Sequence, residues 1–138
     1  MRWSLQTSQG AVDLVVQEGA LGDVVSLLAK ELERGRAFVV SDENVAPLYG
    51  EEVARKLSAP FLALVPGEQA KTWESVEAVV RFLLGHGAER GDLLVAVGGG
   101  VVTDVAGFAA SVYMRGIRWV AVPTTLVGMV DAAIGGKT

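Results

Sequence analysis

Short apolar segments alternate with segments of helical spacing along most of this chain, and this alternation limits its possible folds more than any other feature. The apolar segments cover residues 37–40, 61–65, 93–97 and 117–122. Between them, apolar residues recur at helical intervals, as at Val76, Val80 and Leu83. Strands alternating with helices form βαβ units around a parallel sheet. We therefore expect an α/β fold, with a Rossmann-like, doubly wound, mostly parallel sheet and helices on both faces.

The chain outside these strands carries further local signals. We expect a hairpin of residues 2–7 and 12–16, followed by one helix from Leu21 to a stop at Gly35. Asn44 is placed to cap a second helix and Thr72 a third. These patterns continue without an internal linker, so we expect residues 1–138 to form one domain.

Composition excludes several classes of function. The net charge of −4, with acids and bases interspersed, argues against a nucleic-acid partner. The absence of cysteine removes thiolate metal sites and thiol nucleophiles. The most apolar stretch, residues 93–110, is interrupted by Gly98-Gly99-Gly100 and by Asp104, so it is unsuited to spanning a membrane. We expect a soluble cytoplasmic protein that does not act at a membrane.

The strongest chemical signal is Gly98-Gly99-Gly100, placed between a predicted strand and a predicted helix. Glycines at such a turn allow phosphate groups to approach the amides at the helix N-terminus. The spacing differs from the GxGxxG fingerprint, and a tight turn without a ligand is the alternative. Because three glycines cost backbone entropy without adding packing, we favour a phosphate or nucleotide site.

Three acids and two bases lie near predicted turns. Asp42 and Asp104 could bind a ribose or sugar hydroxyl, or could serve as a turn residue and a helix-dipole partner. Asp131 lies in an apolar segment, which favours a functional role. Lys71 could meet a phosphate or simply be solvated. Arg115, beyond a helix end, could bind an anion or only complement that helix end.

Two apparent motifs carry no site. Gly136-Lys137-Thr138 resembles the end of a P-loop, but Asp131 stands where that motif requires glycine. His86 is the only histidine, and one histidine without cysteine cannot form a zinc site within this chain.

Read in order, the segments of residues 37–138 resemble the 3-dehydroquinate synthase family. The matching segments are Ser41-Asp42-Glu43-Asn44-Val45, Pro66-Gly67-Glu68-Gln69-Ala70-Lys71, Gly98-Gly99-Gly100-Val101-Val102-Thr103-Asp104, Ala106-Gly107-Phe108-Ala109-Ala110, Tyr113-Met114-Arg115-Gly116, Val122-Pro123-Thr124-Thr125-Leu126, Val130-Asp131 and Gly135-Gly136-Lys137-Thr138. The glycine run is shared with iron-dependent alcohol and glycerol dehydrogenases. The Tyr113 and Pro123 segments are more specific to sugar-phosphate cyclases.

The resemblance implies an NAD site and a substrate site. The implied NAD contacts are Asp42, Asn44, Glu68, Lys71, Gly99, Gly100, Val101, Asp104, Thr124, Thr125 and Lys137. The implied catalytic contacts are Arg115, Asp131 and Lys137, with the arginine reaching in from a neighbouring subunit of a homodimer. Two departures from the family pattern are Thr103, in place of a glycine, and Ala132-Ala133, in place of two serines.

The implied activity is the conversion of 3-deoxy-D-arabino-heptulosonate 7-phosphate to 3-dehydroquinate and phosphate, a lyase step of the shikimate pathway. The implied cofactors are NAD and a divalent metal, zinc or cobalt. The resemblance places the metal ligands in a C-terminal helical domain absent from this chain, so we expect residues 1–138 to be an inactive N-terminal NAD-binding domain. The alternatives are another NAD- and metal-dependent sugar-phosphate cyclase, a polyol dehydrogenase, or a stand-alone nucleotide-binding module.

Overall fold

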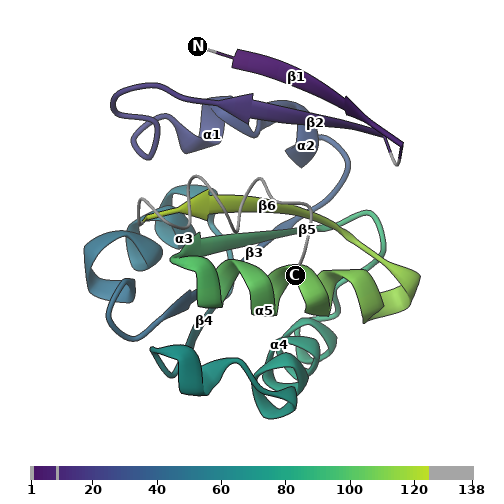
Figure 1. The fold of residues 1–138 in the computed structure, drawn as a ribbon. Coiled ribbons are helices and arrows are strands. Elements are labelled where there is room, and N and C mark those ends of the chain that lie inside the picture. The colour runs from purple at the N-terminus through teal and green to yellow at the C-terminus, as the bar shows by residue number, and fades with distance from the viewer. Residues whose placement is uncertain (1, 9, 125–138) are drawn as a thin grey trace.

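The computed structural model describes residues 2–8 and 10–124, which form a hairpin and a parallel sheet enclosed by helices (Figure 1). The hairpin pairs β1 (Arg2–Thr7) with β2 (Gly10–Val15) in antiparallel register. The second sheet has the order β4-β3-β5-β6, and each of its neighbouring pairs is parallel. Its strands are β3 (Ala37–Asp42), β4 (Phe61–Leu64), β5 (Leu93–Gly98) and β6 (Arg118–Pro123). The hairpin and the parallel sheet confirm the predictions from the sequence.

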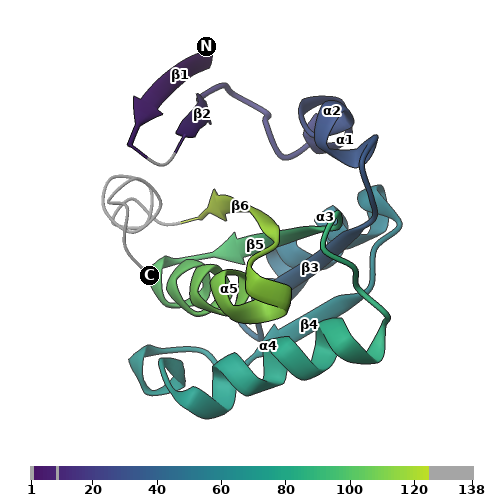
Figure 2. The ribbon, with the colours of Figure 1, turned by 90° about the vertical axis from the view of Figure 1, so that its right-hand side faces the viewer.

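Helices connect these strands. The elements are α1 (Val24–Leu27), α2 (Ala29–Leu32), the π-helical turn η1 (Ala46–Gly50), α3 (Glu51–Leu57), the 3-10 turn η2 (Glu68–Ala70), α4 (Trp73–Gly85), α5 (Gly100–Val112) and the 3-10 turn η3 (Tyr113–Arg115). Figure 2 shows α4 and α5 on one side of the sheet, with α1 and α2 on the other. No helix within residues 2–8 and 10–124 combines the length and the apolar character needed to cross a bilayer.

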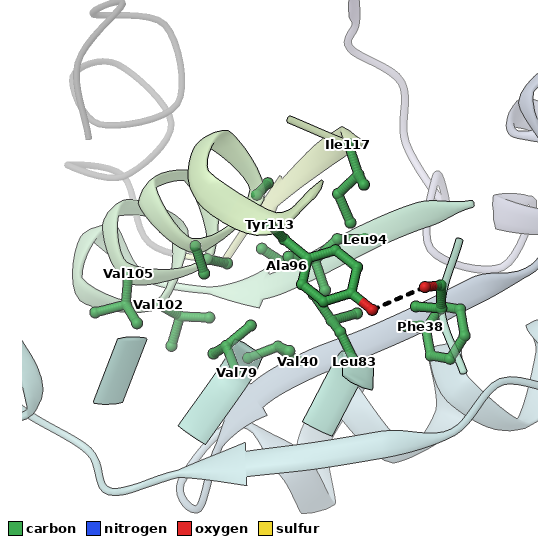
Figure 3. Packing of buried hydrophobic residues seen from close by; sticks show 14 of the residues in the cluster. Phe38, Val40, Val79, Leu83, Leu94, Ala96, Val102, Val105, Tyr113 and Ile117 are labelled. Carbon is green, nitrogen blue, oxygen red and sulfur yellow. Dashed lines mark hydrogen bonds between the residues drawn. The ribbon is translucent and has the colours of Figure 1, made fainter. Parts of the chain in front are cut away.

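The two faces of the sheet carry separate apolar cores. On one face, Phe38 and Leu94 pack with α4 and α5 (Figure 3). On the other face, Val39 and Val95 pack with α1 and α3. Side chains alternate between the faces of a strand, so a strand that is apolar throughout can serve both cores. The doubly wound arrangement is therefore confirmed.

Some local predictions were wrong. The single helix expected from residue 21 is divided at Leu28, whose φ of −100° and ψ of 6° depart from helical values. Asn44 caps no helix. Instead, the Asp42 carboxylate accepts hydrogen bonds from the amides of Asn44 and Val45, each at 2.8 Å. Thr72, by contrast, accepts a hydrogen bond from the Ser75 amide and caps α4 as predicted.

A buried carboxylate closes the amino edge of the sheet, where the strands begin. Asp92 is 5% exposed and accepts hydrogen bonds from the amides of Arg36 at 2.8 Å and Glu89 at 2.7 Å. Burial by itself would raise the pKa of Asp92. The two amide hydrogen bonds and the Arg36 guanidinium outweigh burial, so the pKa lies below the usual value of 3.8. The ionised carboxylate therefore stabilises the folded state.

We predict that Asp92→Asn lowers the free energy of unfolding by about 1–3 kcal/mol at pH 7, because an amide –NH₂ would face a backbone donor. The folded pKa is depressed, so this stabilisation is complete above pH 3.8 and is lost as the pH falls through the folded pKa. Denaturant unfolding at a series of pH values should therefore show the penalty shrinking in acid. Glu77→Gln, which breaks an exposed pair with Arg81, is the control and should cost less than about 1 kcal/mol. An equal Asp92→Asn penalty at all pH values would contradict this account.

The end of β5 is packed too closely for any residue larger than glycine. A Cβ on Gly98 would lie 2.8 Å from both Cβ and Cγ2 of Val102, in the first turn of α5. The Val102 side chain is itself 2% exposed and has little room to move. Gly98 therefore allows the close approach of β5 to α5.

We predict that Gly98→Ala destabilises the protein by about 1–3 kcal/mol through overpacking. Gly85→Ala is the matched control, because a Cβ there meets nothing within 4 Å at the end of α4. The control should be neutral or stabilise by up to about 1 kcal/mol. Thermal or denaturant unfolding distinguishes the two variants, and a Gly98→Ala protein as stable as the parent would show that this contact is unimportant.

Candidate functional site

The order of the strands defines one switch point at the carboxyl edge of the sheet, and we call the region beyond the ends of β3 and β5 the crevice. From β3 the chain passes through α3 to β4 on one side, and from β5 it passes through α5 to β6 on the other. The β3–β5 ladder ends at the pair Val40–Ala96, although β3 continues to Asp42 and β5 to Gly98 along their outer neighbours. Ligands of open α/β sheets bind where the strand order reverses in this way.

The glycine turn forms one wall of this crevice. Strand β5 ends at Gly98, Gly99 is extended, and α5 begins at Gly100 without a side-chain cap. The first amides of a helix have no partner within the helix, and the helix dipole makes this end positive. The structure therefore confirms that the glycines join a strand to a helix, and a helix end of this kind can accept an anionic group.

The Asp42 turn forms the opposite wall. Asp42 ends β3 and is half-buried, and its Oδ1 atom holds the amides of Asn44 and Val45. Asn44 itself is exposed. The role as a turn residue that the sequence left open for Asp42 is therefore present in the structure.

An ion pair brings Lys71 and Asp104 together. The Lys71 Nζ atom lies 2.7 Å from Asp104 Oδ2, which joins the loop after β4 to α5. Asp104 lies beyond the first turn of α5, which weakens the helix-dipole role left open for it, and is 9% exposed. Its Oδ1 atom is buried and has no hydrogen-bond partner within the part of the chain that the structure describes. A buried acceptor without a hydrogen bond destabilises the folded protein unless a donor reaches it.

The Lys71–Asp104 pair borders a groove of about 220 Å³ between α4 and α5. The groove is lined by Lys71, Thr72, Trp73, Val76, Asp104, Val105 and Phe108. Trp73 and Phe108 meet edge to face, with 5.4 Å between ring centroids. Trp73 is 74% exposed, although it is a large apolar residue. The groove therefore combines an ion pair with an accessible aromatic wall.

The remaining predicted residues near this edge are placed as follows. Glu68 is exposed at the start of η2, Val101 lies in the first turn of α5, and the Thr124 amide donates to the Gly98 carbonyl at 2.9 Å. Thr103 is fully buried, and its hydroxyl donates to the Gly100 carbonyl at 3.1 Å. Its extra bulk is accommodated within α5. Thr125, Asp131, Ala132, Ala133 and Lys137 lie outside the described residues.

Arg115 lies at the opposite edge of the sheet. It follows α5 and precedes β6, whose first residue pairs with the first residue of β5. Arg115 is exposed, and both it and Met114 have positive φ angles, of 66° and 49°. One chain therefore does not bring Arg115 together with Lys71.

The amino edge also carries a second groove of about 310 Å³, which is lined by Asp13, Lys30, Glu31, Glu33, Arg34 and Arg118. Arg118 donates from one nitrogen to the carbonyls of Glu31 and Gly91, so it joins α2 to the sheet. Within the described ranges, no group of three or more histidine, aspartate or glutamate side chains is arranged to hold a metal ion.

Sequence reasoning missed Ser41, which is fully buried and donates through Oγ to the Val97 carbonyl at 2.8 Å. A serine near the end of an apolar strand gives no signal of its own, because its partner lies 56 positions away along the chain. Sequence reasoning also missed the hydrogen bond from the Arg36 amide to Asp92, because these two residues are likewise 56 positions apart.

Comparison with known proteins identifies the family. Residues 61–138 match the sequence model of the 3-dehydroquinate synthase N-terminal domain. A 3-dehydroquinate synthase from Gloeobacter violaceus is 47% identical over 131 residues, which cover 91% of this chain and 36% of that protein. The chain spans 34–40% of the length of the curated relatives it matches.

Two solved structures share the fold. The 2-epi-5-epi-valiolone synthase from Streptomyces hygroscopicus, determined with NAD⁺ and Zn²⁺, is 42% identical with a TM-score of 0.77, covering 90% of this chain and 35% of that one. A 2-deoxy-scyllo-inosose synthase, determined with carbaglucose-6-phosphate, NAD⁺ and Co²⁺, is 30% identical with a TM-score of 0.78. The match covers 93% of this chain and 36% of that one. The match of the family model, supported by these likenesses, shows that this chain belongs to the 3-dehydroquinate synthase family.

Proposed function

We propose that this chain binds NAD in the crevice between the ends of β3 and β5. The observation that carries this proposal is the uncapped glycine turn at the point where the strand order reverses. The buried Oδ1 of Asp104, which lacks a donor among the described residues, fits a ribose hydroxyl as its partner. The NAD contacts would be Asp42, Asn44, Glu68, Lys71, Gly99, Gly100, Val101, Asp104, Thr124, Thr125 and Lys137.

The activity that we propose for the whole protein is that of a 3-dehydroquinate synthase. The substrate would be 3-deoxy-D-arabino-heptulosonate 7-phosphate, and the products 3-dehydroquinate and phosphate. When bound, NAD supplies transient oxidation of a ring hydroxyl, which acidifies the adjacent C–H and permits loss of phosphate. Family membership and the relatives named 3-dehydroquinate synthase support this assignment.

The chain's own residues would hold the anionic groups of the substrate. The 2.7 Å ion pair of Lys71 with Asp104 supports this, because it would put a cation beside the proposed cofactor. Asp131 and Lys137 would contact the substrate within the same chain. Arg115, at the far edge of the sheet, would serve the site of a second copy in a homodimer, because it cannot reach the crevice of its own chain. The protein would act in the cytoplasm.

A divalent metal does not fit the described part of this chain. Three protein ligands and an open position are typical of catalytic zinc, and the described residues offer no such group. We therefore place the zinc or cobalt site in a further domain, because the relatives extend well beyond the part matched here. Residues 1–138 would then be an N-terminal NAD-binding domain that is inactive by itself.

A second candidate is another NAD- and metal-dependent sugar-phosphate cyclase. It is favoured by the likeness to 2-epi-5-epi-valiolone synthase, at 42% identity. Both candidates use the same crevice and differ in the substrate. Turnover of 3-deoxy-D-arabino-heptulosonate 7-phosphate by the full-length protein separates them, because the second candidate would leave this substrate unchanged.

We predict that Gly100→Val weakens NAD binding by about ten-fold or more, because a branched side chain would occupy the space above the helix amides. Isothermal titration of NAD into the full-length protein measures the effect. Gly85→Ala, at the end of α4 that faces the amino edge, is the control and should bind NAD like the parent. Unchanged affinity in Gly100→Val would remove the glycine turn from the NAD site.

We also predict that residues 1–138 alone neither retain zinc nor release phosphate from the sugar acid. The full-length protein should do both, because it would supply the metal ligands and the other wall of the active site. Metal analysis after gel filtration and a phosphate-release assay test the two proteins side by side. Turnover by the short protein would show that the metal site lies within this chain.

A further inference from the structure

Strands β3 and β5 separate at the crevice, and one buried hydroxyl spans the gap. Their ladder ends at Val40–Ala96, so the next residues, Ser41 and Val97, are not paired through the backbone. The Ser41 Oγ atom donates to the Val97 carbonyl at 2.8 Å in their place. Both residues are fully buried, so water cannot substitute for the serine without a rearrangement.

The Ser41 side chain is confined by its surroundings. A Cβ on Gly50 would lie 2.7 Å from both Cβ and Oγ of Ser41, so the turn η1 packs directly against this serine. The Phe61 ring of the neighbouring strand closes the same space, 3.1 Å from that position. The hydroxyl therefore has little freedom to turn away from the Val97 carbonyl.

The two ends of this hydrogen bond lie beside the two walls of the proposed NAD site. Ser41 immediately precedes Asp42, whose carboxylate organises the turn after β3. Val97 immediately precedes Gly98, which leads into the glycine turn. A change in the Ser41–Val97 separation would move one wall relative to the other. Because NAD would contact both walls, its affinity depends on their spacing.

We propose that Ser41 is a positioning residue that sets the spacing between the Asp42 turn and the glycine turn, and thereby the affinity for NAD. The inference rests on the proposed NAD site, and it adds a residue that touches no part of the cofactor. The proposed role of Ser41 differs from a purely stabilising one, because the effect of Ser41 on NAD binding is transmitted through Asp42. Loss of the hydroxyl therefore affects cofactor binding as well as folding.

Tyr113 provides a matched control. Its hydroxyl is also buried and also donates to a backbone carbonyl, that of Ala88, at 2.7 Å (Figure 3). This bond lies at the amino edge, away from the crevice. Ser41→Ala and Tyr113→Phe each remove one buried hydroxyl, so they should lower the melting temperature of the full-length protein similarly. Only Ser41→Ala should change NAD binding.

The test is titration of NAD into full-length parent, Ser41→Ala and Tyr113→Phe, well below their melting temperatures. We expect Ser41→Ala to raise the Kd for NAD about five-fold and Tyr113→Phe to change it less than about two-fold. In an Asp42→Ala background, Ser41→Ala should have less than about a two-fold effect, because both changes act on the same turn. If Ser41→Ala does not fold, Ser41→Cys, whose thiol is somewhat larger than the hydroxyl and donates only weakly, takes its place.

Equal NAD affinities in the parent and the Ser41 variant would overturn the positioning role while leaving the proposed function intact. An equal loss in Tyr113→Phe, or full additivity with Asp42→Ala, would also overturn it and would leave only a contribution to stability. Failure of the parent itself to bind NAD would overturn the proposed function, and this inference with it.

Discussion

Strand β5 is buried on both faces along its whole length, and the rest of the structure depends on this constraint. Leu93, Val95 and Val97 face the core under α1 and α3, while Leu94 and Ala96 face the core under α4 and α5. A strand enclosed in this way must have neighbours on both edges and helices on both faces. The reversal of strand order beside β5, and hence the crevice, follows from that position.

The glycines at the end of β5 join this core to the site. Gly98 lets α5 approach β5 within the contact distance of Val102, and Gly99 then leads into α5 without supplying a side-chain cap. The same close packing that completes the core thus presents a positive helix end at the crevice. Strand β5, which organises the fold, also ends at the proposed phosphate position. No further element is needed to place the glycine turn.

Much of this arrangement could be predicted from local sequence. Apolar runs at strand length indicated β3 to β6, and the Thr72 cap and the glycine turn were recognisable from residue type. Contacts between distant positions could not be predicted in this way. The Ser41–Val97 and Asp92–Arg36 hydrogen bonds each join residues 56 positions apart, so neither leaves a periodic signal. The same limit applies to Arg115, whose distance from the crevice becomes evident only when α5 is placed in space.

The most direct test of this account is a crystal structure of the full-length protein with NAD. We expect the pyrophosphate oxygens within about 3.2 Å of the backbone nitrogens of Gly100 or Val101, with a ribose hydroxyl donating to Oδ1 of Asp104. NAD bound instead in the amino-edge groove beside Arg34 and Arg118, or a pyrophosphate distant from the start of α5, would contradict it.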